Sequence, residues 1–122
     1  MATSILVVHS RPVEGREDEF NSWYSDVHLP EVLRVDGFVT ARRYRFVPAY
    51  EEEPPGGLPY LAVYEVADGR LEEARAALAA ALERSRLAVT EGRTPELAVS
   101  SALDRQFRTA WYEPLDAGGG TG

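Results

Sequence analysis

The sequence predicts an α+β fold with the ferredoxin-like order β-α-β-β-α-β, in which both helices lie on one face of an antiparallel sheet. Three observations predict it. The chain has 122 residues, a length that suits one domain. Its composition, 44% hydrophobic and 27% charged, is that of a globular protein with a buried core. Apolar runs with the period of a strand alternate with runs that have the period of a helix.

The N-terminal part is expected to form a strand and then a helix. Residues 4–10 are rich in β-branched side chains, and Pro12 ends this run because proline has no N–H for a strand ladder. A helical face follows, and its apolar positions are Phe20, Trp23, Tyr24 and Val27. Pro30 is expected to stop or kink this helix, which would leave His28 at or near the helix C-terminus.

Residues 38–47 are expected to form the second strand, which opens a central hairpin. Alternation places one set of side chains on one face, namely Phe38, Thr40, Arg42, Tyr44 and Phe46. The opposite face then holds Val39, Ala41, Arg43, Arg45 and Val47. The next stretch, 48–59, contains three consecutive glutamates and then Pro-Pro-Gly-Gly, which is typical of an exposed loop.

A third strand and a long helix are expected next. Residues 60–66 alternate between apolar and polar positions, as a strand does. Asp68 is expected to cap the following helix, which runs past Arg84 until the stretch from Gly92 to Pro95 ends it. The apolar positions of this helix are Leu71, Ala74, Leu78 and Leu82.

The C-terminal part is less regular. Residues 96–104 favour neither a helix nor a strand, whereas 106–113 predict the fourth strand. These assignments place one domain over residues 1–115. The glycine-rich end, 116–122, is predicted to be a disordered tail.

Charge and missing residue types exclude several functions. The chain has 20 acidic and 13 basic residues, and its net charge of −7 argues against nucleic acid or an anionic membrane as partner. Every basic residue is arginine and cysteine is absent, which excludes lysine Schiff bases, disulfides and cysteine nucleophiles. No run reaches the roughly 20 apolar residues of a membrane span, and the N-terminus lacks a signal-peptide pattern. A cytoplasmic location is therefore predicted.

One face of the predicted sheet has no helix to cover it. Aromatic side chains are nevertheless expected there, in particular Phe38, Tyr44, Phe46 and Tyr60 or their neighbours. A large apolar face of this kind needs a partner in water. A second copy of the chain, paired sheet to sheet, would cover it, so the sequence predicts a homodimer.

Two parts of the sequence resemble a known family. The first is the segment Phe20–Leu33, with Trp-Tyr at 23–24, His28 and Pro30, followed by Gly37-Phe38 and Ala41–Tyr44. The second is Tyr60–Glu65, then a helix, then Trp111–Leu115. They resemble the dimeric α+β barrel superfamily, and within it the EthD-like branch. The resemblance covers most of residues 4–115 and implies that two sheets pair to form a barrel.

The resemblance is compatible with several reactions. The superfamily includes lactone isomerases, polyketide cyclases, cofactor-free quinone-forming monooxygenases, haem-handling enzymes and proteins without known activity. We expect a small cofactor-independent enzyme that acts on an apolar aromatic or polyketide-like molecule of secondary metabolism. Cyclisation with dehydration, isomerisation and oxygenation are the candidate steps. A non-catalytic small-molecule-binding or accessory protein of the same fold is the alternative.

His28 is the first candidate catalytic residue. It stands four residues after Tyr24, so the two share a helix face, and its ordinary pKa suits a general acid or base. The resemblance implies that His28 faces a cavity, whereas a structural hydrogen bond at a helix end is the alternative. Tyr24 would orient the proton. Arg42, Arg43 or Tyr44 would stabilise an oxyanion, with ion pairing to carboxylates as the competing role of the arginines.

The candidate substrate-binding residues are mostly aromatic, because aromatic walls suit a flat apolar ligand. They are Trp23, Phe38, Tyr44, Tyr60 and Tyr64, together with His9. Packing in a dimer core is the alternative role for the Tyr60 and Tyr64 pair, and a structural role is the alternative for His9. Two histidines do not make a three-histidine zinc site, and Glu31 and Glu65 show no ligand spacing. Neither a metal nor a cofactor is predicted.

Overall fold

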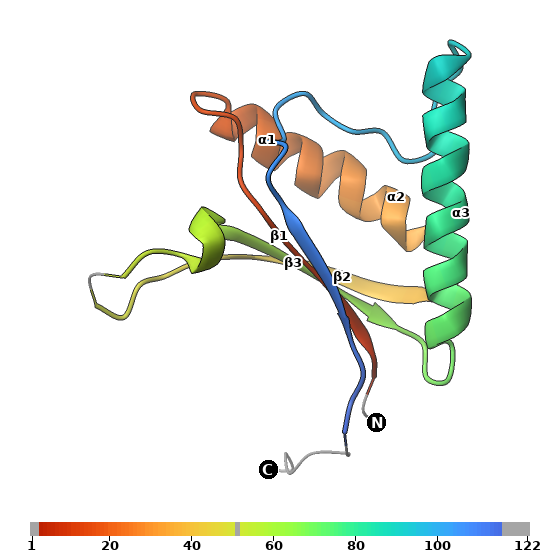
Figure 1. Cartoon of the computed structure of the whole chain (residues 1–122), viewed down its shortest axis with the longest axis horizontal. Coiled ribbons are helices and arrows are strands. Elements are labelled where there is room, and N and C mark those ends of the chain that lie inside the picture. Colours follow the sequence, from red (N-terminus) through yellow and green to blue (C-terminus); the bar gives the residue numbers. More distant parts are fainter. Residues whose placement is uncertain (1–2, 51, 116–122) are drawn as a thin grey trace.

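The computed structural model describes residues 3–50 and 52–115 (Figure 1). Its strands are β1 (Ile5–Ser10), β2 (Phe38–Arg45), β3 (Tyr60–Val66) and β4 (Arg108–Tyr112). Its helical elements are α1 (Glu17–Trp23), the π turn η1 (Tyr24–His28), α2 (Leu29–Leu33), the 3-10 turn η2 (Pro55–Gly57) and α3 (Leu71–Thr90). The predicted tail, 116–122, lies outside the described residues. None of the described helices is long and apolar enough to cross a membrane.

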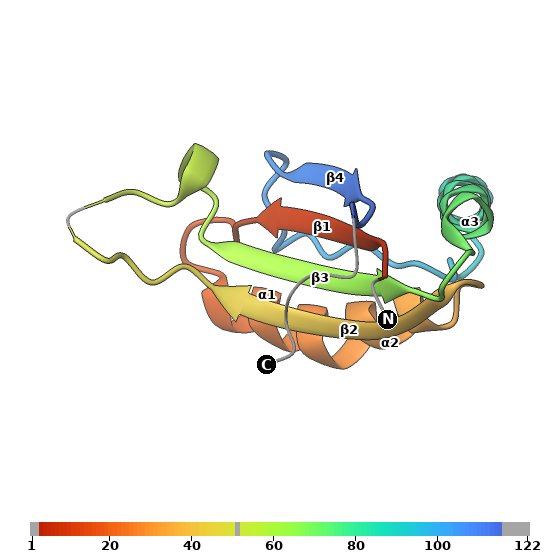
Figure 2. The same ribbon diagram turned by 90° about the horizontal axis from the view of Figure 1, so that it is seen from below.

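The four strands form one antiparallel sheet in the order β2-β3-β1-β4 (Figure 2). This order and the succession of elements along the chain confirm the predicted α+β, ferredoxin-like fold. The central strand β3 alternates strictly, and its buried side chains are Tyr60, Ala62, Tyr64 and Val66. The face that these four residues share carries the core.

Both helical segments lie on this face of the sheet. In Figure 1, α1 and α2 run in one line across the sheet, while α3 stands upright at one end of it. The core cluster joins the helices to the strands and includes Phe20, Tyr24, Val32, Phe38, Tyr64 and Ala81. The sheet and the two helical segments therefore enclose the interior from different directions.

The first helix does not end at Pro30. α1, η1 and α2 form one helical segment from Glu17 to Leu33, so the prediction that His28 lies at a helix C-terminus is wrong. In a regular helix a proline ring clashes with the carbonyl four residues earlier. Here the wider π turn precedes the proline, and the Leu29 N–H donates to the Tyr24 carbonyl five residues back. The extra residue in this turn makes room for the ring.

The π turn also changes which side chains point inward. With one residue added to the turn, the inward positions follow a spacing of four, at Phe20, Tyr24, His28 and Val32. Val27, expected on the apolar face, is instead 41% exposed. The simple helical period is wrong for Val27 because it assumes a regular α-helix throughout.

A register shift between Phe38 and Thr40 divides β2. Beyond the shift, Arg42 and Tyr44 share the face without helices, as the alternation predicts. Phe38 instead pairs with Val66 and is only 6% exposed, in the core. The prediction that Phe38 shares a face with Tyr44 is wrong because the bulge adds one residue to the strand. Tyr60, expected on the same uncovered face, also lies in the core.

Three further details concern the C-terminal part. Asp68 does not cap α3: the N-cap is Arg70, which makes no side-chain capping hydrogen bond. The expected end of this helix before 92–95 is confirmed. Residues 96–104 form a loop with turns, in which Leu103 makes an isolated bridge to Pro12. The fourth strand is shorter at both ends than predicted.

Gly37 sets how closely α3 approaches the start of β2. Its φ is +99°, and a Cβ at this position would lie 2.7 Å from the Cβ of Ala74, a fully buried residue of α3. The Ala67 N–H donates to the Gly37 carbonyl at 2.8 Å, which fixes the connection into the helix. The missing side chain thus lets α3 pack where it does.

Replacing Gly37 with alanine should lower the free energy of unfolding by roughly 2–4 kcal/mol, because backbone strain adds to overpacking. Gly69 is the matched control: its φ is +75°, but nothing lies within 4 Å of a Cβ built there. Gly69→Ala adds strain alone, about 1–2 kcal/mol. Urea unfolding followed by circular dichroism measures both values. Equal losses in the two variants would contradict the close approach of α3.

Candidate functional site

An apolar cavity of about 200 Å³ lies between the sheet and the helices. β1 contributes Leu6 and Val8 to its wall, and α3 contributes Leu78 and Leu82. One end of the cavity is aromatic and is formed by Trp23, Tyr24, His28 and Tyr64. None of the described residues that line it carries a charged side chain, so the cavity suits a neutral ligand.

The loop between α3 and β4 completes the wall. Leu97 is buried there, while Val99 and Phe107 lie at the outer edge with 70% and 49% of their surface exposed. Leu82 faces them from α3 and is also 49% exposed. Because these exposed apolar side chains surround one side of the cavity, we assign that side as its mouth.

Three buried polar atoms at the aromatic end make no hydrogen bond with any described residue: Trp23 Nε1, His28 Nδ1 and the Tyr64 hydroxyl. Such groups are rare in folded proteins, because an unpaired buried donor or acceptor costs about 1–3 kcal/mol. The indole N–H only donates, and a tyrosine hydroxyl donates or accepts. A ligand oxygen that reached Trp23 and Tyr64 would satisfy both.

Aromatic rings enclose His28. The Trp23 ring stacks on it with centroids 4.8 Å apart, and the Tyr24 ring meets it edge-on at 5.1 Å. The prediction that Tyr24 and His28 share one face of the helix is thereby confirmed. Burial lowers the pKa of His28 to about 4. The imidazole is therefore neutral at pH 7, with one nitrogen that donates and one that accepts.

The two tyrosines at this end are protonated. Burial raises the pKa of both Tyr24 and Tyr64, whose side chains lie close to each other. They are 2% and 1% exposed, respectively. The site thus combines a neutral imidazole with hydroxyl and indole donors in apolar surroundings. These groups can bind an oxygen atom of a ligand and exchange a proton with the ligand atom next to it.

Arg43 lies beside this site and does not line the cavity. Its guanidinium covers the rings of Tyr24, Tyr60 and Phe20 at 4.7, 5.3 and 5.4 Å from the ring centroids. Its N–H groups donate to Asn21 Oδ1 at 2.9 Å and to Ser25 Oγ at 3.1 Å. Arg43 therefore binds α1 and η1 to the sheet, and its described partners are aromatic, amide and hydroxyl groups.

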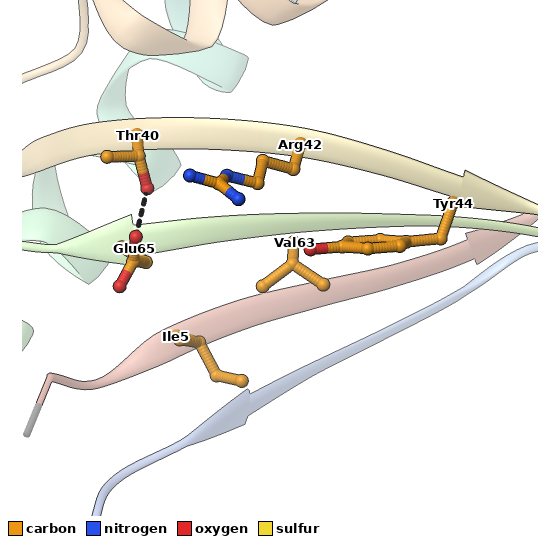
Figure 3. Close-up of a pocket in the computed structure, with 6 residues that line it drawn as sticks. All are labelled: Ile5, Thr40, Arg42, Tyr44, Val63 and Glu65. Carbon is orange, nitrogen blue, oxygen red and sulfur yellow. Dashed lines mark hydrogen bonds between the residues drawn. The ribbon is translucent and has the colours of Figure 1, made fainter. Parts of the chain in front are cut away.

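Arg42, Tyr44 and His9 lie on the opposite face of the sheet, so the structure does not bring them to His28. A concavity of about 400 Å³ lies on that face. The residues that line it, drawn in Figure 3, are Ile5, Thr40, Arg42, Tyr44, Val63 and Glu65. The Thr40 hydroxyl donates to Glu65 at 2.5 Å, which lowers the pKa of that carboxyl. Within residues 3–50 and 52–115, no three His, Asp or Glu side chains gather as a metal site.

The sequence did not lead us to predict that Ser10 and residues of the loop between α3 and β4 line the cavity. Ser10 is 1% exposed and lines the cavity from the end of β1. Alternation along that strand already places it with Leu6 and Val8, so this signal was present in the sequence. No pattern within 96–104 marks those residues as cavity wall, because their contacts are to distant parts of the chain.

Comparisons with known proteins support the fold. No protein-family model matches the sequence, and no curated protein matches it. A crystal structure of an EthD family protein from Bacillus halodurans C-125 is similar, with a TM-score of 0.51, 14% identity and coverage of 90% of this chain and 97% of that one. A candidate monooxygenase from Shewanella loihica PV-4 has a TM-score of 0.49 and 13% identity, covering 95% of this chain and 98% of its own. The chain therefore shares the α+β architecture of the EthD family protein.

The lowered pKa of His28 makes a pH-dependent contribution to stability. Between pH 6.5 and 4 the unfolded chain binds the proton and the folded chain does not, so stability falls as the pH falls. Urea unfolding at pH 7.5 and 4.5 should show wild type losing roughly 2–3 kcal/mol more than His28→Gln. His28→Gln keeps the neighbouring titratable groups Tyr24, Tyr64 and Glu31, so the difference isolates the imidazole. Parallel losses would mean that His28 keeps its ordinary pKa.

Proposed function

We propose that this protein is a small enzyme that binds a neutral aromatic or polyketide-like molecule in the cavity at His28 and transfers a proton of that molecule. One observation carries the proposal: a neutral, largely buried imidazole lines the same uncharged cavity as the unpaired donors of Trp23 and Tyr64. This combination gives a base and two hydrogen-bond donors in one cavity.

The proton transfer follows from these groups. His28 accepts a proton from a carbon next to a carbonyl group, the electron pair of the C–H bond forms a C=C bond, and the π electrons of the carbonyl move to its oxygen. The resulting enolate oxygen receives hydrogen bonds from the Trp23 N–H and the Tyr64 hydroxyl. The imidazolium then returns the proton, either to another carbon, which gives an isomer, or to a hydroxyl that leaves as water. Oxygenation of a phenol would need dioxygen as a further substrate.

Burial makes the free imidazole a weak base, since its pKa of about 4 lies well below neutral pH. In the transfer step, however, the imidazolium forms next to the enolate. Opposite charges attract strongly in apolar surroundings, and this attraction offsets the lost hydration of both groups. The cavity therefore disfavours a lone charge and tolerates the charge pair of the reaction.

The low pKa of His28 also favours a second function, a non-catalytic protein that binds the same class of ligand. In that case the neutral ring accepts a hydrogen bond from a phenol or donates one to a carbonyl, and no proton moves. The apolar wall and its mouth serve both functions equally. Turnover, and not binding, separates them.

Ligand binding can be followed through Trp23 in a Trp111→Phe background. We expect 1,4-naphthoquinone to quench Trp23 emission with saturation, and 2-naphthoate to bind at least about tenfold more weakly, because nothing in the lining offsets desolvation of its carboxylate. Trp23→Phe with Trp111 intact is the control and should give no saturable quenching. Equal affinity for the two compounds would contradict a neutral-ligand cavity.

Turnover is tested on any neutral phenol, quinone or polyketide-like compound that the wild type converts. His28→Ala should then lower kcat by roughly 10²–10⁴ while circular dichroism shows a folded protein. His9→Ala, a change on the opposite sheet face, should leave kcat unaffected. Full activity in His28→Ala would remove His28 from the reaction, and binding without any conversion would favour the non-catalytic function.

We also propose that the chain forms a homodimer through the face of the sheet that has no helix. Tyr44 and Tyr112 on this face are 48% and 55% exposed, and Val63 lies near its centre. The concavity at Arg42 and Glu65 would then lie between the two sheets. Burial of these apolar side chains supports the pairing.

Light scattering at micromolar concentration should give twice the chain mass of 13.5 kDa. Val63→Arg, which adds a second cation beside Arg42, should shift the protein to the monomer. Val89→Arg is the matched control, since Val89 is an exposed residue of α3 away from the sheet. A monomer mass for the wild type at every concentration would contradict the dimer.

A further inference from the structure

Glu31 is an unusual carboxylate in this protein. It follows His28 by three residues, and only 11% of its side chain is exposed, whereas the acidic residues of the ion pairs on α3 are more than half exposed. Its Oε1 lies 3.9 Å from His28 Nδ1. Burial raises the pKa of Glu31, although the hydrogen bond from the Ala98 N–H opposes that shift. A largely buried carboxylate next to a largely buried imidazole calls for a physical reason.

The same oxygen of Glu31 also holds the cavity wall. Oε1 accepts a hydrogen bond from the Ala98 N–H at 3.0 Å, and the residues on either side of Ala98 line the cavity. The Leu97 N–H donates to Ser85 Oγ of α3 at 3.0 Å, which anchors the segment on its other side. Glu31 therefore occupies a position between the loop wall and the histidine ring.

We propose that Glu31 is the positioning residue of His28: its carboxylate, fixed by the Ala98 N–H, holds the ring with a protonated Nδ1 toward Oε1 and leaves Nε2 as the acceptor for a ligand. A carboxylate only accepts hydrogen bonds, so the ring nitrogen that faces it is the one that carries hydrogen. His28 Nδ1 has no other hydrogen-bond partner among the described residues. A small rotation of either side chain shortens 3.9 Å to hydrogen-bond distance.

The catalytic consequence rests on the proposed function. When His28 takes a proton from the substrate, the ring becomes a cation within an apolar cavity. A carboxylate at Nδ1 stabilises that cation, in addition to the enolate on the other side. Glu31 therefore acts on the imidazolium that the transfer step forms, and does so without contacting the substrate.

The ring tautomer is measured directly in uniformly ¹⁵N-labelled protein, from two-bond ¹⁵N–¹H correlation spectra at pH 7. His9→Gln leaves one histidine and assigns its signals to His28. We expect at least about a tenfold excess of the Nδ1–H tautomer in wild type, because a hydrogen bond to a carboxylate is worth more than one to water. In Glu31→Gln and Glu31→Ala this excess should disappear.

Glu72→Gln is the matched control, because Glu72 is an exposed helical glutamate with no contact to His28, and it should leave the tautomer unchanged. A wild-type His28 with hydrogen mainly on Nε2 would overturn the proposal. An unchanged tautomer ratio in a folded Glu31 variant would do the same. The wild-type spectrum decides the tautomer even if both Glu31 variants unfold.

The tautomer is a property of the ligand-free protein. A negative turnover result with a confirmed Nδ1–H tautomer would therefore reject the enzymatic function and keep the role of Glu31. Turnover that depends on His28, together with a His28 tautomer that carries hydrogen on Nε2, would reject the role of Glu31 and keep the enzymatic function.

Discussion

A single wide turn of helix, Tyr24–His28, allows Pro30 to sit inside a continuous helical segment and points His28 inward below Tyr24. In a regular α-helix Val27 would share the inward face with Phe20 and Tyr24, whereas the added residue turns Val27 outward, where it is 41% exposed. The rest of the site follows from this turn: Trp23 stacks on the ring, Glu31 reaches its Nδ1, and the ring meets the cavity. π turns are frequent at functional sites, where the added residue redirects a side chain.

The cavity is neutral inside a strongly acidic protein. Carboxylates surround the outside of the helices. The polar groups of the described residues that line the cavity are instead hydroxyl, indole and imidazole groups. Burial works in opposite directions on these groups: it lowers the pKa of His28 and raises that of Tyr64, so both are uncharged at pH 7. The carboxylate of Glu31 lies 3.9 Å from the ring of His28, on the far side of the cavity wall.

The two faces of the sheet carry different features. Arg43 and Tyr60 join the first helical segment to the sheet next to the cavity, and Arg42 and Tyr44 face the other way. Alternation along β2 separates the two arginines that the sequence offers as one group of candidates. Neither arginine lines the cavity at His28, so neither places a cation there to stabilise an oxyanion. The hydrogen-bond donors that remain in the cavity are Trp23 and Tyr64.

The sequence alone determined the order of elements, the α+β class, the bounds of β3 and the nearness of Tyr24 to His28, because these depend on local period and spacing. Tertiary structure decided the rest. The π turn moved Val27 outward, the bulge moved Phe38 into the core, and residues within 96–104 became part of the cavity wall. The π turn and the bulge each add one residue to a regular period, which the period alone does not reveal. The position of the loop depends on contacts between distant residues, such as Ala98 with Glu31, and a local pattern contains no information about such contacts.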